Sequence, residues 1–297
     1  MYPRSFHYHR ATSLAEAATM LSQLGDDAKF LAGGQSLIPL MKLRFANPQH
    51  LVDLNFVAGT SYIKQEDGRL RFGPLTRHSE IEHSEKARLI PIIHDCAAGI
   101  ADVQVRNRGT IGGSLAEADP SGDWATVLLT QKAELSCLGP KGTRTIPLQE
   151  FILDAYTTAL EHDELVAEVV VDFPPPGSGS AYLAFKRSAP VYPTASAAVQ
   201  LSLAKDICTD ISITLGCVGL VPIRAKESEA TLRGHRIDEN AIATAAEAAR
   251  DSAEPQADMR GSAEYKRTLV AALVKKTIRI ALQRARGEQV EIRHIYA

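Results

Sequence analysis

Cysteine pairs at metal-binding spacing are absent from this chain of 297 residues. The four cysteines are Cys96, Cys137, Cys208 and Cys217. None of them belongs to a CxxC motif, so their spacing encodes neither a zinc ribbon nor an iron–sulfur cluster. We expect buried free thiols instead.

Histidine is also too scattered to form an evident metal site. His7 and His9 alternate on an expected strand and could share a face, but two ligands without a third make a weak site. The remaining histidines, His78 among them, are expected to be solvated or to cap helices. The sequence therefore predicts no bound metal.

An excess of charge of one sign and long apolar runs are both missing. The 33 basic and 35 acidic residues give a formal charge of −2, which offers no electrostatic case for binding nucleic acid or an anionic membrane. No stretch is long enough to span a bilayer, and the N-terminal MYPRSFHYHR lacks the apolar core of a signal peptide. We expect a cytoplasmic protein with no integral membrane segment.

Several familiar nucleotide and hydrolase motifs are absent too. There is no GxGxxG between the first strand and helix, which argues against a dinucleotide Rossmann site. There is no GxxxxGK[ST] of a P-loop NTPase and no GxSxG elbow of a hydrolase. We also find no internal repeat and no low-complexity tract.

What the chain does have is a dense group of backbone donors and small residues in Thr110 to Asp123, with the sequence TIGGSLAEADPSGD. Gly112 and Gly113 remove two Cβ atoms in succession, so the backbone can take a positive φ and approach a ligand closely. A run of exposed N–H groups can hold a diphosphate without any lysine. Pro120 suits the first turn of the next helix, with Asp119 as its N-cap. We interpret this segment as the main phosphate-binding loop.

An earlier segment has a similar design. Ala32 to Leu37, with the sequence AGGQSL, follows the apolar run 29–31 and precedes Leu40 and Met41 at helical spacing. The order is strand, glycine loop, helix. A single diglycine beside a serine is usually a tight turn. Two such loops, each entering a helix, indicate a ligand site.

These two loops resemble the flavin loops of a known family, the FAD-binding medium subunit of molybdenum hydroxylases, which includes carbon monoxide dehydrogenase and xanthine dehydrogenase. The resemblance covers nearly the whole chain and includes PLTRHSEIE at 74–82, VRNRG at 105–109 and FKR at 185–187. It implies an α+β fold, in which a two-lobed α/β FAD-binding domain (PCMH-like) precedes a small C-terminal domain of antiparallel strands and helices.

The resemblance also implies an oxidoreductase subunit with FAD as its cofactor. In such complexes a molybdenum subunit oxidises the substrate, a small iron–sulfur subunit relays electrons, and the FAD passes them to an external acceptor. The implied partners are a 2Fe-2S small subunit and a molybdopterin large subunit, in a dimer of heterotrimers. The acceptor stays open among oxygen, a quinone, NAD and a carrier protein. Because flavin carries the redox chemistry, we expect residues that contact the cofactor and no catalytic acid or base.

Position by position, the resemblance implies a set of FAD-contact residues drawn from both loops and from four later or intervening segments. The set is Phe30, Leu31, Ala32, Gly33, Gly34, Gln35, Ser36, Leu37, Ile100, Thr110, Ile111, Gly112, Gly113, Ser114, Asp123, Val166, Lys186 and Tyr192.

Four of these residues also have a plain structural interpretation. Asp123 matches a family aspartate on the cofactor, or it simply starts a helix. Lys186 matches a family lysine near the flavin, or it is a solvated strand lysine. Val166 and Ile100 match positions where apolar groups meet the cofactor, or they are core. Tyr192 corresponds loosely to an aromatic residue that shields the ring in some relatives.

Hydrophobic patterns divide the chain into three parts, 1–57, 58–176 and 177–297. With 45% hydrophobic residues, its length is enough for two or three domains. In the first part Ser13 and Glu16 form a capping box that starts a helix, and Gly25 ends it. The βαβ-like order indicates a small α/β lobe. The expected strands of this lobe are 6–8, 29–31 and 51–54.

The second part should mix helices with antiparallel strands. Asp67 and Gly68 form a hairpin signal, and Thr76 is expected to cap a helix that runs through Ile81. The expected helices are 76–81, 89–100 and 124–129, and the expected strands are 62–64, 70–72, 133–138, 143–146 and 164–173.

The run 174–180, PPPGSGS, has the composition of a linker and indicates a domain boundary. Beyond it we expect three antiparallel strands against a layer of helices. The expected strands are 181–187, 195–204 and 210–217, and the expected helices are 224–232, 239–250 and 262–286.

Two other functions compete with the family interpretation. One is a free-standing FAD-dependent oxidase with its own substrate pocket, which would need a larger substrate domain than the compact C-terminal part offers. The other is a scaffold subunit that has lost FAD, which the intact glycine loops argue against.

Overall fold

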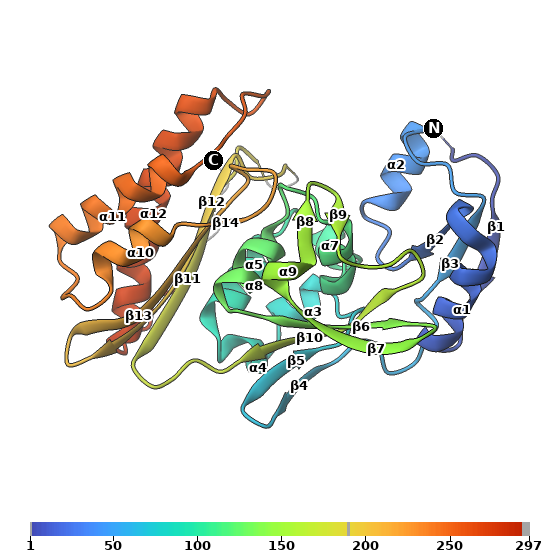
Figure 1. The fold of residues 1–297 in the computed structure, drawn as a ribbon, viewed down its shortest axis with the longest axis horizontal. Coiled ribbons are helices and arrows are strands. Elements are labelled where there is room, and N and C mark those ends of the chain that lie inside the picture. Colours follow the sequence, from blue (N-terminus) through green and yellow to red (C-terminus); the bar gives the residue numbers. More distant parts are fainter. Residues whose placement is uncertain (1, 189–190, 293–297) are drawn as a thin grey trace.

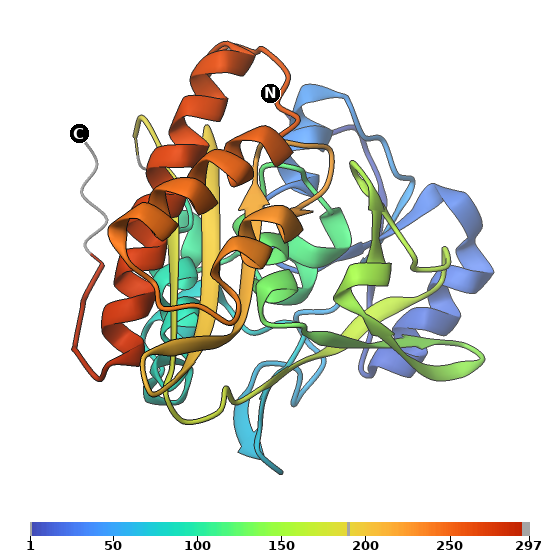
Figure 2. The ribbon, with the colours of Figure 1, turned by 60° about the vertical axis from the view of Figure 1, so that its left-hand side comes forward.

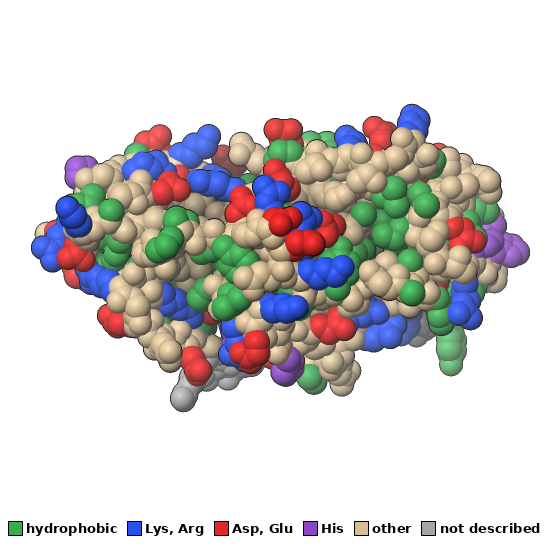
Figure 3. Space-filling view, turned by 90° about the horizontal axis from the view of Figure 1, so that it is seen from below, with side chains coloured by type: hydrophobic (Ala, Val, Ile, Leu, Met, Phe, Trp, Pro, Cys, Tyr) green, Lys and Arg blue, Asp and Glu red, His purple; other side chains and the backbone are tan. Residues whose placement is uncertain are grey.

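The computed structural model describes residues 2–188 and 191–292. Within these residues, buried apolar side chains form three clusters. The first lobe, the central lobe and the C-terminal domain follow one another along the longest dimension of the molecule (Figure 1). None of the helices formed by the described residues combines the length and apolar character needed to cross a membrane. On the face in Figure 3, basic and acidic side chains are interspersed.

The first lobe is a small parallel sheet with two helices. The strand order is β1-β3-β2, and both pairings are parallel. Ser13 caps the first helix by accepting from the Glu16 N–H, while the Glu16 carboxylate reaches back to the N–H of Thr12 instead of Ser13. The elements are β1 (His7–Arg10), α1 (Leu14–Leu24), a 3-10 turn (Gly25–Asp27), β2 (Ala28–Leu31), α2 (Leu37–Leu43) and β3 (His50–Asp53).

The central lobe packs short helices against a five-stranded antiparallel sheet of order β4-β5-β10-β6-β7. Asp67 and Gly68 both have positive φ, at 50° and 73°, which confirms the tight hairpin between β4 and β5. The elements are β4 (Ile63–Glu66), β5 (Arg69–Phe72), α3 (His78–Glu82), α4 (Glu85–Arg88), α5 (Pro91–Gly99), α6 (Val103–Arg106), α7 (Ile111–Glu117), α8 (Asp123–Thr130), β6 (Glu134–Gly139), β7 (Gly142–Pro147), α9 (Leu148–Phe151), β8 (Ile152–Asp154), β9 (Thr157–Thr158) and β10 (Leu165–Asp172).

One helix of this lobe begins later than expected. Thr76 does not cap it, because its hydroxyl accepts from the N–H of Tyr62 and donates to the Tyr62 carbonyl. The helix α3 starts at His78 with Arg77 as its N-cap. Because the Thr76 hydroxyl makes this tertiary hydrogen bond, the N-cap of the helix lies one residue later than the local sequence predicts.

The prediction of a helix starting at Pro120 is also wrong. The Asp119 carboxylate accepts from the Ser121 N–H at 2.8 Å, which closes a turn instead of capping a helix. The next helix, α8, starts only at Asp123, and Gly122 is its N-cap. The glycine segment itself forms the helix α7, capped by Thr110.

The C-terminal domain is a four-stranded antiparallel sheet with helices on one face (Figure 2). We expected three strands, and a two-residue strand, β14, adds a fourth at the edge. Alternate strand residues such as Val199 and Ile213 pack under the helices. The elements are β11 (Ser178–Phe185), β12 (Ala195–Ala204), β13 (Ile207–Gly216), β14 (Ile223–Arg224), α10 (Lys226–Leu232), α11 (Glu239–Ser252) and α12 (Ala263–Ala285).

A buried ion pair joins this domain to the central lobe. Arg284 of α12 donates to both oxygens of Asp95 in α5, at 2.6 and 3.0 Å, and to the Ser180 carbonyl at 2.7 Å. Asp95 is 3% exposed, and burial raises the pKa of its carboxyl to about 6 although Arg284 opposes the shift. The pair fixes the long helix against the domain that carries the candidate site.

Candidate cofactor site

A cavity of about 900 Å³ runs between the first lobe and the central lobe and reaches the end of β11. Seventeen of the eighteen residues predicted to contact FAD line it. Ile111 is the exception, because its side chain is fully buried in the central hydrophobic core. The two glycine loops, far apart in the sequence, thus meet at one cavity.

The two loops touch one another directly. An ideal Cβ on Gly33 would collide with the carbonyl oxygen of Arg108 and lie 2.9 Å from the Gly109 Cα. From the other side, an ideal Cβ on Gly113 would lie 3.7 Å from the Ala32 Cβ. Gly33 is therefore required for the close approach of the first loop to the turn that precedes the second.

The first loop offers a run of free backbone donors. Among the described residues, no acceptor pairs with the N–H groups of residues 33–37. The helical bonding pattern starts with Ile38, which donates to the Gly34 carbonyl. Gly34 has a φ of +72°, which favours glycine. Five consecutive N–H groups at the start of a helix, all in residues that line the cavity, make an anion-binding arrangement.

In the second loop the corresponding donors are already used. The N–H of Ile111 donates to the Thr76 carbonyl at 3.1 Å, and that of Gly112 donates to the Pro74 carbonyl at 3.0 Å. Gly113 donates to the Thr110 hydroxyl at 3.1 Å. The prediction that this loop presents a run of exposed N–H groups is therefore wrong.

Its glycines serve packing instead of unusual backbone angles. Neither Gly112 nor Gly113 has a positive φ, since both lie in the first turn of α7. An ideal Cβ would lie 2.7 Å from the Pro74 carbonyl at Gly112 and 2.6 Å from the Thr110 hydroxyl at Gly113. The second loop is therefore tightly packed, and it lines the same cavity as the first loop.

A buried cluster of polar side chains lies where the cavity meets β11. The Lys186 ammonium is 3.4 Å from Asp123 Oδ1 and donates to the Gly99 carbonyl at 2.6 Å. The hydroxyl of Tyr182 donates to the same Asp123 oxygen at 2.7 Å. The side chains of Lys186 and Asp123 are only 5% and 6% exposed, so Lys186 is not a solvated strand lysine. Asp123 starts α8, where the helix dipole also favours its negative charge.

The remaining three predicted FAD contacts, Ile100, Val166 and Tyr192, differ in the exposed fraction of their side chains. Ile100 and Val166 are 8% and 4% exposed and belong to the central core while also lining the cavity. Tyr192 is half exposed in the segment after β11. Tyr156 is likewise exposed and lines the cavity, although the sequence did not single it out.

Sequence reasoning also missed His78, which lines the cavity and is 5% exposed. Its Nδ1 accepts a hydrogen bond from the indole N–H of Trp124 at 3.1 Å. Burial, with Arg77 and Arg106 adding to it, lowers the pKa of His78 to about 3. The expectation that this histidine is solvated or caps a helix is therefore wrong. The one signal in the sequence was the position of His78 within PLTRHSEIE, a segment that the family resemblance includes, but composition alone gives this histidine no role.

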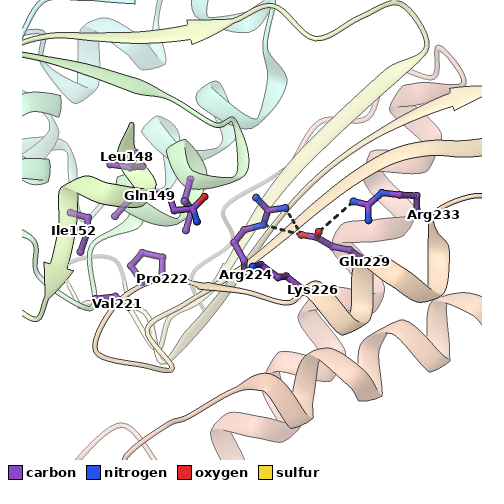
Figure 4. Close-up of a pocket in the computed structure, with 11 residues that line it drawn as sticks. Leu148, Gln149, Ile152, Val221, Pro222, Arg224, Lys226, Glu229 and Arg233 are labelled. Atoms are coloured by element: carbon purple, nitrogen blue, oxygen red, sulfur yellow. Dashed lines mark hydrogen bonds and ion pairs between the residues drawn. The ribbon is translucent and has the colours of Figure 1, made fainter. Parts of the chain in front are cut away.

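A second cavity, of about 520 Å³, lies between the central lobe and the helix α10 (Figure 4). The Glu229 carboxylate accepts from Arg224 at 2.7 and 2.8 Å and from the Ile213 N–H at 2.8 Å. Arg233 approaches the other carboxylate oxygen at 3.5 Å. These ion pairs hold α10 on β13, and none of the predicted FAD contacts lies here.

The first cavity suits a dinucleotide such as FAD. Its volume is at the upper end of the range for small-molecule sites. Its lining combines the free backbone amides of residues 33–37, which can bind a diphosphate, with the buried pair of Lys186 and Asp123. The missing Cβ at Gly33 lets the loop that carries these amides lie directly against Arg108 and Gly109.

Known proteins share this architecture. Residues 4–174 match the FAD binding domain in molybdopterin dehydrogenase, and residues 180–281 match the CO dehydrogenase flavoprotein C-terminal domain. The chain is 38% identical over 286 residues to the carbon monoxide dehydrogenase medium chain of Hydrogenophaga pseudoflava, covering 96% of this chain and 99% of that one. It is 38% identical over 296 residues to the 6-hydroxypseudooxynicotine dehydrogenase complex subunit alpha of Paenarthrobacter nicotinovorans, covering 99% and 100% of the two chains.

Solved structures agree with this likeness. Carbon monoxide dehydrogenase from Hydrogenophaga pseudoflava, in a form that lacks the Mo-pyranopterin moiety, matches with a TM-score of 0.93 at 38% identity. The match covers 96% of this chain and 99% of that chain. The α+β fold and the FAD cofactor are thereby confirmed. With two matched domains that together span most of its length, the chain belongs to the family of FAD-binding medium subunits of molybdenum hydroxylases.

Proposed function

We propose that this oxidoreductase subunit takes electrons from the iron–sulfur clusters of a partner subunit and passes them to an external acceptor. When bound, FAD supplies the redox chemistry. The observation that carries the proposal is the cavity that joins the acceptor-free amides of residues 33–37 to the Asp123–Lys186 pair. Tyr192 and Tyr156, 50% and 63% exposed on the cavity lining, show that the cavity reaches the surface at these residues.

The chain's own residues bind and orient the cofactor. The N–H groups of residues 33–37 would hold the diphosphate, and Gly33 of the first loop lies closely against Arg108 and Gly109, which precede the second loop. Lys186 and Asp123 would hold the flavin part of the cofactor, and Tyr192, which lines the same cavity, would shield it. We keep as FAD contacts the seventeen predicted residues that line the cavity, whereas Ile111 supports the loop from the core.

We further propose a 2Fe-2S small subunit and a molybdopterin large subunit as partners, in a dimer of heterotrimers. The names of the relatives, a medium chain and a complex subunit, support a multi-subunit assembly. These relatives differ in the substrate that their names give, which agrees with substrate choice by the large subunit. The identity of the electron acceptor and the cytoplasmic location stay predictions.

The proposed division of the chain is 1–57 and 58–176 for the two lobes and 177–297 for the C-terminal domain. The three hydrophobic clusters support it, since most of their members fall within one part each. Leu75 and Leu165 of the second part join the cluster of the first lobe, which ties the two lobes together around the cavity.

A comparison of flavin reduction in the isolated chain and in its complex tests the electron-transfer function. We expect the isolated FAD-loaded chain to stay oxidised when the substrate of the complex is added, as followed by flavin absorbance. In the native complex the same substrate should bleach the flavin. Substrate turnover by this chain alone would instead favour the free-standing oxidase.

A further inference from the structure

His78 lies at the edge of the FAD cavity with one ring nitrogen fixed and the other free. The Trp124 indole N–H can only donate a hydrogen bond, so the His78 Nδ1 that it contacts at 3.1 Å must be the unprotonated nitrogen. In a neutral imidazole the proton then resides on Nε2. Trp124 therefore selects one tautomer of this histidine.

The Nε2–H group has no acceptor among the described residues. Gly109, whose carbonyl accepts from the His78 backbone N–H at 3.1 Å, leaves the space that the ring edge occupies. An ideal Cβ on Gly109 would lie 2.6 Å from Nε2. The ring nitrogen is not fully enclosed, so it stays reachable from the cavity. Both Gly109 and His78 line the cavity, so a bound ligand can supply that partner.

The surroundings keep the ring neutral. Arg77 and Arg106 both disfavour a positive charge on His78, and Glu82 is engaged by the Arg106 guanidinium at 2.8 Å. With burial as the largest cause, the pKa of His78 lies near 3. The Nε2–H group is thus present at every physiological pH.

We propose that His78 donates a hydrogen bond from Nε2 to an acceptor atom of the bound FAD, and that Trp124 holds the ring in the tautomer that allows it. The inference rests on the placement of FAD in this cavity. His78 is then a cofactor-binding residue, and Trp124 is a positioning residue that acts through it. The pair connects the first residue of α3 with the first turn of α8.

The test compares three variants of the full chain by FAD titration of the apoprotein, with flavin fluorescence as the readout. His78→Phe keeps a planar ring but removes the donor, and we expect FAD to bind about tenfold more weakly, the order of magnitude for one lost hydrogen bond. His78→Gln retains an N–H donor and should recover most of the affinity. Trp124→Phe should weaken binding by a few-fold, because the imidazole is then free to change tautomer.

A second measurement uses the unmodified chain with ¹⁵N-labelled histidine. NMR should show Nε2 protonated and Nδ1 unprotonated, and the Nε2–H resonance should shift when FAD is added. An Nε2–H resonance that does not respond to FAD, or a folded His78→Phe variant with unchanged affinity, would overturn the proposal. Failure of the unmodified chain to bind FAD would instead contradict the placement of the cofactor itself.

Discussion

Gly33 stands at the contact between the two glycine loops, where any side chain would meet the Arg108 carbonyl. We expect Gly33→Ala to lower the free energy of unfolding by roughly 1–3 kcal/mol, the usual cost of overpacking. It should also weaken FAD binding by at least about tenfold, because the loop amides must shift. Urea unfolding of the apoprotein and FAD titration measure the two effects.

Gly68 in the β4–β5 hairpin provides the control. It has a φ of +73° and no heavy atom within 4 Å of an ideal Cβ. Gly68→Ala should therefore cost about 1 kcal/mol through backbone strain alone and leave FAD affinity unchanged. Equal losses of FAD affinity in both variants would contradict a specific role for Gly33.

We expect the contributions of Lys186 and Asp123 to the free energy of unfolding to be coupled. Lys186→Met leaves the buried carboxylate of Asp123 with the Tyr182 hydroxyl as its remaining partner, which we expect to cost about 3–5 kcal/mol of unfolding free energy. Adding Asp123→Asn should recover part of this loss, because the unpaired charge is gone. A double-mutant cycle by urea denaturation measures the coupling, and a coupling near zero would show that the pair is not formed.

His78 should also make stability depend on pH. Its pKa is lowered from about 6.5 to about 3 on folding, so the unfolded chain binds the extra proton between these values. Stability is then full above pH 6.5 and falls on acidification, by up to about 1.4 kcal/mol per pH unit. Asp95, whose pKa is raised to about 6, acts in the opposite sense between pH 4 and 6. The free-energy difference between the unmodified chain and His78→Gln isolates the histidine, and a pH-independent difference would contradict its burial in the neutral form.

At the scale of elements, local patterns predicted most of the strands and helices. The strand 195–204 has the expected bounds, because alternating apolar residues on a long hairpin strand are a strong local signal. The errors at Thr76 and Pro120 have one cause in common. In both places a polar side chain that could start a helix makes another hydrogen bond, to Tyr62 in the first case and to Ser121 in the second.

The long helix α12 allows a matched test of the link between domains. Arg284→Met should lower the unfolding free energy by about 3–5 kcal/mol, because it leaves the buried Asp95 carboxylate without its ion-pair partner and with only the Tyr182 backbone N–H as a donor. Arg279→Met, on the same helix, removes an exposed pair with Glu239 and should change stability little. Thermal unfolding of the two variants compares them, and similar melting temperatures would mean that the buried pair does not hold the domains together.

At the scale of the whole molecule, the sequence predicted which segments meet but not how each one contributes. Both glycine loops reach one cavity, as expected from their similar sequences and from the helix that each loop enters. Which loop has free amides depends on the carbonyl groups of Pro74 and Thr76, which pair with the second loop across the fold. A local sequence pattern cannot show such partners. The sequence therefore assigned the main anion site to the second loop, whereas the structure assigns it to the first.

Gly113→Val illustrates the consequence. The sequence alone predicts a variant that loses FAD with its fold largely intact. The structure places the new side chain against the Thr110 hydroxyl that caps α7. We therefore expect a lower melting temperature together with weaker FAD binding, measured by circular dichroism and flavin content on one sample. A variant with an unchanged melting temperature would instead support the prediction from the sequence alone, that FAD is lost while the fold stays largely intact.

A crystal structure of this chain with FAD bound tests the central claim most directly, because it locates the diphosphate. We expect its oxygens about 2.9 Å from backbone nitrogens within residues 33–37. The hydrogen bonds of Ile111 to Thr76 and of Gly112 to Pro74 should persist. A diphosphate bound instead to the amides of residues 111–114, with those two bonds broken, would contradict the account.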